Sequence, residues 1–378
     1  MEAKATYTLR DLLNYFLKLG TIGFGGPVAL VGYMHRDLVE GRKWISEEDY
    51  KEGMALSQLA PGPLAAQLSI YIGYVHYGVR GATLAGLAFV LPSFLMVLGI
   101  SVAYVAYGGL PWMQGMFYGV GAAVIGIIAI GAWKLSKKTL GDDVFKWGIF
   151  LTLAFTTWYT GQEIVWLMLL LAVGFMFLKA PPKRIAAGAI APLPLLLASG
   201  VTTGSQLGGL AWFFTKAGAF VFGSGLAIVP FLYGGVVKEH GWLTEQQFLD
   251  AVAVAMITPG PVVITVAFIG FLVAGFWGAC VAAVATFLPC WVFTVLPAPY
   301  FKKYGKQPSI KAFVDGITAA ACGAIAGAVV VLGSRSLVDL PTWGIAIATV
   351  AVLLYVKKVK EPLVILVAAL SGMALRGF

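Results

Sequence analysis

Uninterrupted apolar stretches recur along the whole chain, and they limit its folds more than any other sequence feature. A helix needs about 20 apolar residues to cross the hydrocarbon core of a bilayer. Because that core offers no water to backbone amides and carbonyls, only helices and closed barrels can cross it. The long stretches do not alternate apolar and polar residues, which excludes the barrel. The sequence therefore predicts an all-α polytopic membrane protein.

The composition supports this class. Hydrophobic residues make up 60% of the 378 residues and charged residues 11%, with a mean hydropathy of +0.88, whereas soluble proteins carry about a quarter charged residues. The net charge of +9 would suit a nucleic-acid binder. The basic residues lie in short loops between apolar stretches, however, so we expect a lipid bilayer and no nucleic acid as partner. No cleavable signal peptide is visible, which favours a prokaryotic plasma (inner) membrane.

A block that breaks the apolar pattern occurs twice. The first copy contains Lys18, Phe24-Gly25-Gly26-Pro27, Trp44 and Pro61-Gly62-Pro63, and the second contains Lys216, Phe222-Gly223-Ser224-Gly225, Trp242 and Pro259-Gly260-Pro261. The two copies keep one spacing (222 − 24 = 198), which after one deletion continues from Pro92 to Pro289 (289 − 92 = 197). Chance does not readily keep one register this long. The sequence therefore predicts an internal duplication.

The loop charges predict that the two copies have opposite orientations. Basic links near Lys134 and Lys179 alternate with links that have no Lys or Arg, and basic links face the cytoplasm. Residues 35–53 hold four Lys or Arg, whereas residues 238–250 hold one. Five clear apolar runs separate the two starts, and an odd number inverts the second copy. Inverted-topology repeats are typical of alternating-access transporters.

The predicted architecture has nine clear spans plus four broken or re-entrant segments at the FGGP and PGP motifs, or 13 spans if all segments cross. Residues 1–184 form an N-terminal transport repeat, 185–211 a connecting helix region, and 212–378 an inverted C-terminal transport repeat. The N-terminus is expected in the cytoplasm and the C-terminus outside. A homodimer is one assembly that the sequence leaves open.

The repeated Phe-Gly-Gly-Pro block, the tryptophan-bearing linker, the Pro-Gly-Pro motif and Leu91-Pro92-Ser93 together resemble the chromate ion transporter family, in its long-chain form with two homologous halves. The resemblance covers nearly the whole chain. It implies efflux of chromate from the cytoplasm and chromate resistance, and some members are associated with sulfate. The second copy departs from the pattern, because Gly225 stands where the first copy has Pro27.

Chromate is a tetrahedral dianion, and a buried dianion needs donors. A helix that restarts after a Gly or Pro break presents free backbone amides and a positive dipole end, and glycine allows an anion to approach closely. Lys18 and Lys216 could add charge, and side chains beside the PGP motifs could donate hydrogen bonds. The candidate substrate-binding residues are Lys18, Phe24, Gly25, Gly26, Pro27, Gln58, Pro61, Gly62, Pro63, Gln67, Lys216, Phe222, Gly223, Ser224, Gly225, Thr258, Pro259, Gly260, Pro261 and Thr265.

Each candidate has a structural alternative. The glycines could serve close helix packing, Lys18 and Lys216 could extend to the lipid interface, and the polar side chains could bond neighbouring helices. Glu47 and Glu245 match across the repeats, which suits proton coupling, but each also stands in a helix-start pattern, Ser46 to Asp49 and Thr244 to Gln247.

The functional prediction is a secondary active exporter of chromate that works by alternating access. A sulfate or other oxyanion carrier and an anion channel are the alternatives. No nucleophile–base pair or metal-ligand cluster is evident within the spans, so we expect no enzyme, no metal and no cofactor. The three cysteines lack ligand spacing and are interpreted as structural.

Overall fold

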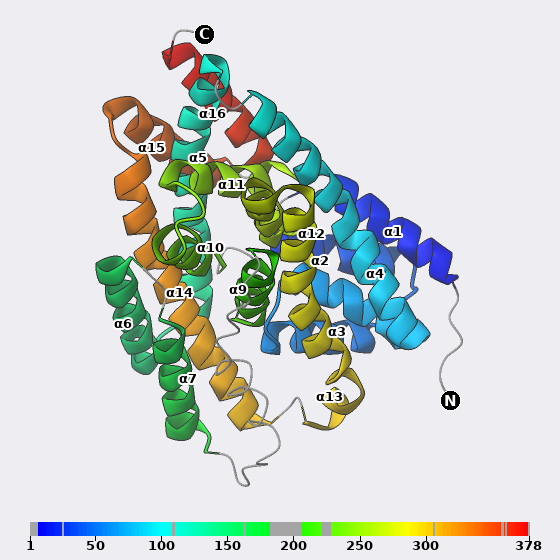
Figure 1. The fold of residues 1–378 in the computed structure, drawn as a ribbon. Helices are drawn as coiled ribbons and strands as arrows, with labels where there is room; N and C mark the ends of the chain where they lie inside the picture. The colour runs from blue at the N-terminus through cyan, green and yellow to red at the C-terminus, as the bar shows by residue number, and fades with distance from the viewer. Residues whose placement is uncertain are drawn as a thin grey trace.

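The computed structural model describes residues 7–24, 26–107, 110–161, 164–181, 206–220, 228–304, 307–356, 359 and 361–376. Every regular element within these ranges is a helix (Figure 1), which confirms the all-α prediction. Four helical stretches in the described ranges are long and apolar enough to cross a membrane: Leu64–Tyr107, Trp112–Leu140, Val262–Phe301 and Pro308–Ser336. Three shorter apolar helices accompany them.

The two halves repeat the same order of helices. The first half contains α1 (Leu9–Ile22), α2 (Gly26–Met34), the π-helical segment η1 (His35–Gly41), α3 (Glu47–Leu59), α4 (Leu64–Tyr107), α5 (Pro111–Leu140), α6 (Val144–Thr160) and α7 (Val165–Lys179). The second contains α9 (Gln206–Phe220), α10 (Ile228–Leu232), the π-helical segment η4 (Tyr233–Glu239), α11 (Glu245–Ile257), the short 3₁₀ helix η5 (Val262–Ile264), α12 (Thr265–Val295), α13 (Ala298–Tyr304), α14 (Pro308–Ser336), α15 (Leu340–Tyr355) and α16 (Glu361–Leu375). Helices α3 and α11 begin at the motif spacing (245 − 47 = 198), and η1 and η4 follow it too.

Helices α3 and α11 begin where the sequence predicts. The Ser46 side chain accepts a hydrogen bond from the amide of Asp49, and Thr244 and Gln247 form a reciprocal capping box. Such caps satisfy amides that have no partner inside the helix. Both helices end within two residues of their Pro-Gly-Pro motif, because proline cannot continue the hydrogen-bond ladder.

Each break in the first half turns the chain back on itself. The ring of Tyr7 stacks on Trp44 at 4.8 Å, and the Tyr15 hydroxyl donates to Asp37 at 3.4 Å, so α1 and the segment of α2 and η1 run antiparallel. After the Pro-Gly-Pro motif, the Tyr71 ring covers Gly53 of α3. The first block is therefore a pair of helical hairpins, with one motif at the tip of each.

Helix α4 bends back sharply at Gly78, where φ is 57° and ψ is −150°. The backbones of Gly73 and Gly81 touch across this turn, so a Cβ on Gly73 would lie 2.3 Å from the Gly81 carbonyl oxygen. Gly275 makes the matching turn in α12, with φ of 61°. The residues around Gly78 thus form a tight turn between two helical segments.

The last helices of each half pack on the other half. Helices α6 and α7 lie against α14, whereas α15 and α16 lie against α5 (Figure 1). Glycines allow the close approach: a Cβ on Gly323 of α14 would lie 2.2 Å from the Phe150 carbonyl oxygen of α6. The cores of the two sequence repeats are therefore interlocked in space.

Candidate functional site

A cavity of about 110 Å³ lies where a break from the first half meets a break from the second. Its walls come from five places in the chain: the α1–α2 break, one face of α5, the end of α11 with its Pro-Gly-Pro motif, the end of α15, and the start of α16. The lining residues are Gly23, Phe24, Pro27, Ile127, Ile130, Gly131, Lys134, Ala255, Met256, Thr258, Gly260, Val262, Leu353, Glu361 and Pro362. Of the sequence-predicted candidates, the cavity brings together Phe24, Pro27, Thr258 and Gly260.

Direct contacts hold the two breaks together. The amide of Gly260 donates to the carbonyl of Gly23 at 3.1 Å, and the Ser93 hydroxyl lies 2.7 Å from the carbonyl oxygen of Pro259. Gly260 has a φ of +98°, and a Cβ there would come within 1.9 Å of the Ser93 Oγ. Only glycine therefore fits this position, which explains one residue of the motif by packing.

Two helix starts border the cavity. Helix α2 begins at Gly26, between the lining residues Phe24 and Pro27, and η5 begins at the lining residue Val262. The first amides of a helix have no partner inside it, and they carry the positive end of the helix dipole. This arrangement suits an anion. The Thr258 hydroxyl, by contrast, is engaged by the carbonyls of its own helix at 3.1 and 3.2 Å.

Lys134 supplies the positive charge among the cavity-lining residues. It follows Ile127, Ile130 and Gly131 on one face of α5, at the spacing that places residues on a common helix side. It forms no ion pair or hydrogen bond within the described part of the chain. Glu361, the first residue of α16, is near enough for the two charges to interact.

Lys134 is the functional candidate that sequence reasoning missed. The loop charges predict that Lys134 belongs to a basic link between two apolar stretches. Helix α5 instead continues to Leu140. The helical stripe of residues 127, 130, 131 and 134 is the sequence pattern that could have identified it.

The first Pro-Gly-Pro motif lies away from this cavity. A Cβ on Gly62 would meet the Cys290 sulfur of α12 at 3.1 Å, a packing position that matches the contact of Gly260 with Ser93. The Gln67 amide donates to the carbonyl of Pro61 at 2.9 Å, and the Thr265 hydroxyl to that of Val262 at 2.8 Å. Pro63 and Pro261 are buried, and Gln58 is exposed.

The two predicted lysines are outside the cavity lining. Lys18 is exposed on α1, and Lys216 is half-buried on α9 with its Nζ 5.6 Å from the centre of the Trp212 ring. Gly25, Phe222, Gly223, Ser224 and Gly225 lie outside the described residues. Their anion-binding role therefore stays a prediction.

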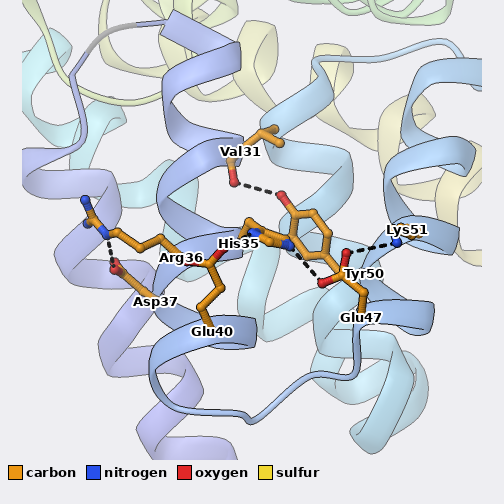
Figure 2. Close-up of polar contacts among 8 residues, drawn as sticks. All are labelled: Val31, His35, Arg36, Asp37, Glu40, Glu47, Tyr50 and Lys51. Carbon is orange, nitrogen blue, oxygen red and sulfur yellow. Dashed lines mark hydrogen bonds and ion pairs between the residues drawn. The ribbon is translucent and has the colours of Figure 1, made fainter.

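Glu47 and Glu245 occupy equivalent ionic clusters. Glu47 binds the His35 Nε2 at 2.9 Å and Lys51 at 3.1 Å (Figure 2). These hydrogen bonds hold the pKa of Glu47 below its ordinary value. Burial pushes the pKa of Glu245 upward, but hydrogen bonds from Lys238 and Tyr233 outweigh it and leave a lowered pKa. Both carboxylates open their helix, so the contacts suit the helix-start interpretation, and proton coupling at either stays a prediction.

Comparison with known proteins places the whole chain among transporters. The sequence pattern of the family described as "Chromate transporter" matches residues 10–178 and 208–373. The chain is 66% identical to a "Chromate transport protein" of Cupriavidus metallidurans, over 97% of this chain and 93% of that one. It is 63% identical to a "Probable chromate transport protein" of Synechococcus elongatus, over 98% and 97%. A "Chromate transport protein" of Pseudomonas aeruginosa is 29% identical over 96% and 91%. No solved structure matches.

Proposed function

Because the chain belongs to the chromate transporter family, we propose that it exports chromate from the cytoplasm across a prokaryotic plasma membrane and so gives chromate resistance. The observation that carries this proposal is the cavity between the two halves, with Lys134 as its positive charge. A dianion in such a cavity would gain two helix starts and one ammonium group as partners, and these would have to outweigh its repulsion from Glu361. These are the donors that a desolvated oxyanion requires.

The repeated hairpins support a secondary active antiporter that works by alternating access. The motif-bearing segments of the first half fold back on themselves, which favours re-entrant hairpins over complete crossings. If the second half is inverted, the two sets of tips enter from opposite faces of the membrane and meet near its middle. A rocking movement of one half against the other would then open the cavity to each side in turn.

The substrate could also be sulfate or another oxyanion of the same shape. Amides and an ammonium group recognise a tetrahedral dianion without reading its central atom. Everted membrane vesicles distinguish these substrates, because an exporter then accumulates its substrate inside. We expect energised vesicles with the protein to accumulate chromate in a saturable manner, and sulfate to compete to the extent that it shares the site.

Lys134→Gln tests the site itself. Loss of a charged hydrogen-bond donor should raise the half-saturation concentration for chromate roughly tenfold or more. Lys137→Gln is the matched control, because Lys137 is exposed on the same helix, as Lys134 is, but lies outside the cavity lining and packs on Trp133. An unchanged half-saturation concentration for chromate in Lys134→Gln would show that the cavity is not the binding site. Vesicles that accumulate no chromate would overturn the proposed function, and non-saturable flux would indicate a channel instead.

A further inference from the structure

A buried carboxylate lies on the helix that leads to the cavity. Asp250 is only 4% exposed, and it stands inside α11 just before the apolar segment that ends at the second Pro-Gly-Pro motif. Neither the cavity lining nor the helix start accounts for it. An ionisable residue that is buried in a transporter without a cationic partner is a candidate for a functional role.

The partners of Asp250 are neutral. Its Oδ2 accepts a hydrogen bond from the Tyr104 hydroxyl of α4 at 2.7 Å, and its Oδ1 accepts one from the Gln246 amide at 2.9 Å. The Tyr104 ring packs on Phe117 of α5 and Phe268 of α12. The carboxylate therefore sits in apolar surroundings with two donors and no ion pair within the described part of the chain.

The charged groups on the elements around α11 either have other partners or lie at the far end of that helix. Lys238 of η4 and Arg335 of α14 pair with Glu245, one and a half turns before Asp250. Arg376, after α16, lies over Tyr118 of α5. Lys134 of α5 and Glu361 of α16 line the cavity at the other end of α11. A carboxylate shielded from water and without a cation binds a proton more readily than an exposed one.

Helix α11 connects Asp250 to the cavity directly. Ala255, Met256 and Thr258 line the cavity from its end, and the eight residues from Asp250 to Thr258 span ~12 Å of helix. A dianion in the cavity and an ionised Asp250 would repel each other across a poorly screening interior. The other half carries Glu52 at the equivalent position of α3, where a side-chain hydrogen bond links it to Tyr71.

We propose that Asp250 is the proton-binding residue of the transport cycle, and that it takes up one proton when the oxyanion enters the cavity. The inference rests on the proposed function, since it assigns a regulator to that same site. The proton passes from water to a carboxylate oxygen of Asp250 as the anion binds, and returns to water as the anion leaves. The proton would thus offset one of the two negative charges of the bound chromate.

Chromate binding to the purified protein in lipid nanodiscs tests this linkage. For the wild type, we expect calorimetry in buffers of different ionisation enthalpy to show uptake of about one proton per bound anion. The affinity should fall ~tenfold per pH unit above the midpoint, the slope of a one-proton linkage. Asp250→Asn, which imitates the protonated side chain, should bind chromate without this uptake. Because chromate itself titrates near neutral pH, the variants are compared with the wild type at each pH.

Tyr104→Phe is the second variant, and it keeps the carboxylate. Loss of the donor destabilises the ionised form, so the midpoint of the pH profile should move to higher pH while proton uptake persists. If the Tyr104 hydrogen bond had only a structural role, its loss would not move the midpoint of the pH dependence of chromate affinity. Equal proton uptake in Asp250→Asn and wild type, or an unmoved midpoint in Tyr104→Phe, would overturn the inference. If the wild type binds chromate with an affinity that does not depend on pH, the inference alone is overturned. If the wild type binds no chromate, the proposed function is overturned with it.

Discussion

Single residues decide how closely the two breaks approach. Ser93 and Gly260 meet where the halves join, and their equivalents Cys290 and Gly62 meet on the other side. The Leu-Pro-Ser motif and the Pro-Gly-Pro motif therefore act as partners across the halves. The sequence showed both motifs but gave no reason to pair the serine of one half with the glycine of the other.

Gly260→Ala should destabilise the protein for two reasons. A φ of +98° strains any L side chain, and the new methyl group would collide with the Ser93 Oγ. Together these effects should cost roughly 2–4 kcal/mol. A lower melting temperature in detergent is the expected result. Adding Ser93→Ala should restore only part of the loss, because it removes the collision but also the hydrogen bond to the Pro259 carbonyl, and it leaves the strain.

Gly32→Ala is the control for that substitution. Gly32 lies in α2 with nothing within 4 Å of an added Cβ, so its replacement should leave the melting temperature unchanged or slightly higher. If the double variant melts no higher than Gly260→Ala alone, contact with Ser93 is not what restricts position 260.

At the scale of the helical element, the tight turns in α4 and α12 each need a central glycine, Gly78 or Gly275, for conformation alone. An added Cβ on Gly78 would meet nothing within 4 Å, yet its φ of 57° lies in a region that L residues avoid. Gly275 has the same properties. A substitution at either position therefore measures the cost of backbone strain without a packing collision.

Gly78→Ala should therefore cost about 1–2 kcal/mol and lower the melting temperature. Gly99→Ala is its counterpart, because Gly99 lies in the regular part of the same helix with equal space around it. There alanine should stabilise by up to ~1 kcal/mol through its better helix propensity. Equal effects of both substitutions on thermal unfolding would show that the turn at Gly78 is relaxed in solution.

At the scale of the whole molecule, each half completes the other. Helices α6 and α7 pack on α14, and α15 and α16 pack on α5. Helices α5 and α14 are therefore each covered by helices of the other half. A chain divided between residues 181 and 206 should therefore function only when both pieces are expressed together. Co-purification of an untagged half with a tagged half measures this association.

Gly119→Ala should weaken that association. Its new Cβ would lie 1.9 Å from the carbonyl oxygen of Ala368 on α16, whereas the same change at Gly121, two residues along, meets nothing within 4 Å. Lower recovery of the untagged half with Gly119→Ala than with Gly121→Ala is the expected outcome. Equal recovery would mean that the α5–α16 contact does not hold the halves together.

The sequence by itself determined the class of fold, the repeated order of helices and the positions of the breaks. These follow from local chemistry: apolar length, helix caps, and glycine and proline where a helix must stop. It also made Phe24, Pro27, Thr258 and Gly260 candidates, because each stands at such a break, and all four line the cavity.

Only the tertiary structure decided which breaks meet. The motif at Phe24 joins the Pro-Gly-Pro motif at Gly260 of the other half, and Pro61-Gly62-Pro63 faces away towards α12. Lys134 and Asp250 became candidates through the same packing, because only the folded chain brings Lys134 to the cavity and buries Asp250 without a cation among the described residues. Contacts between segments from 100 (127 − 27) to 339 (362 − 23) residues apart depend on how long helices dock, and no local pattern encodes that docking.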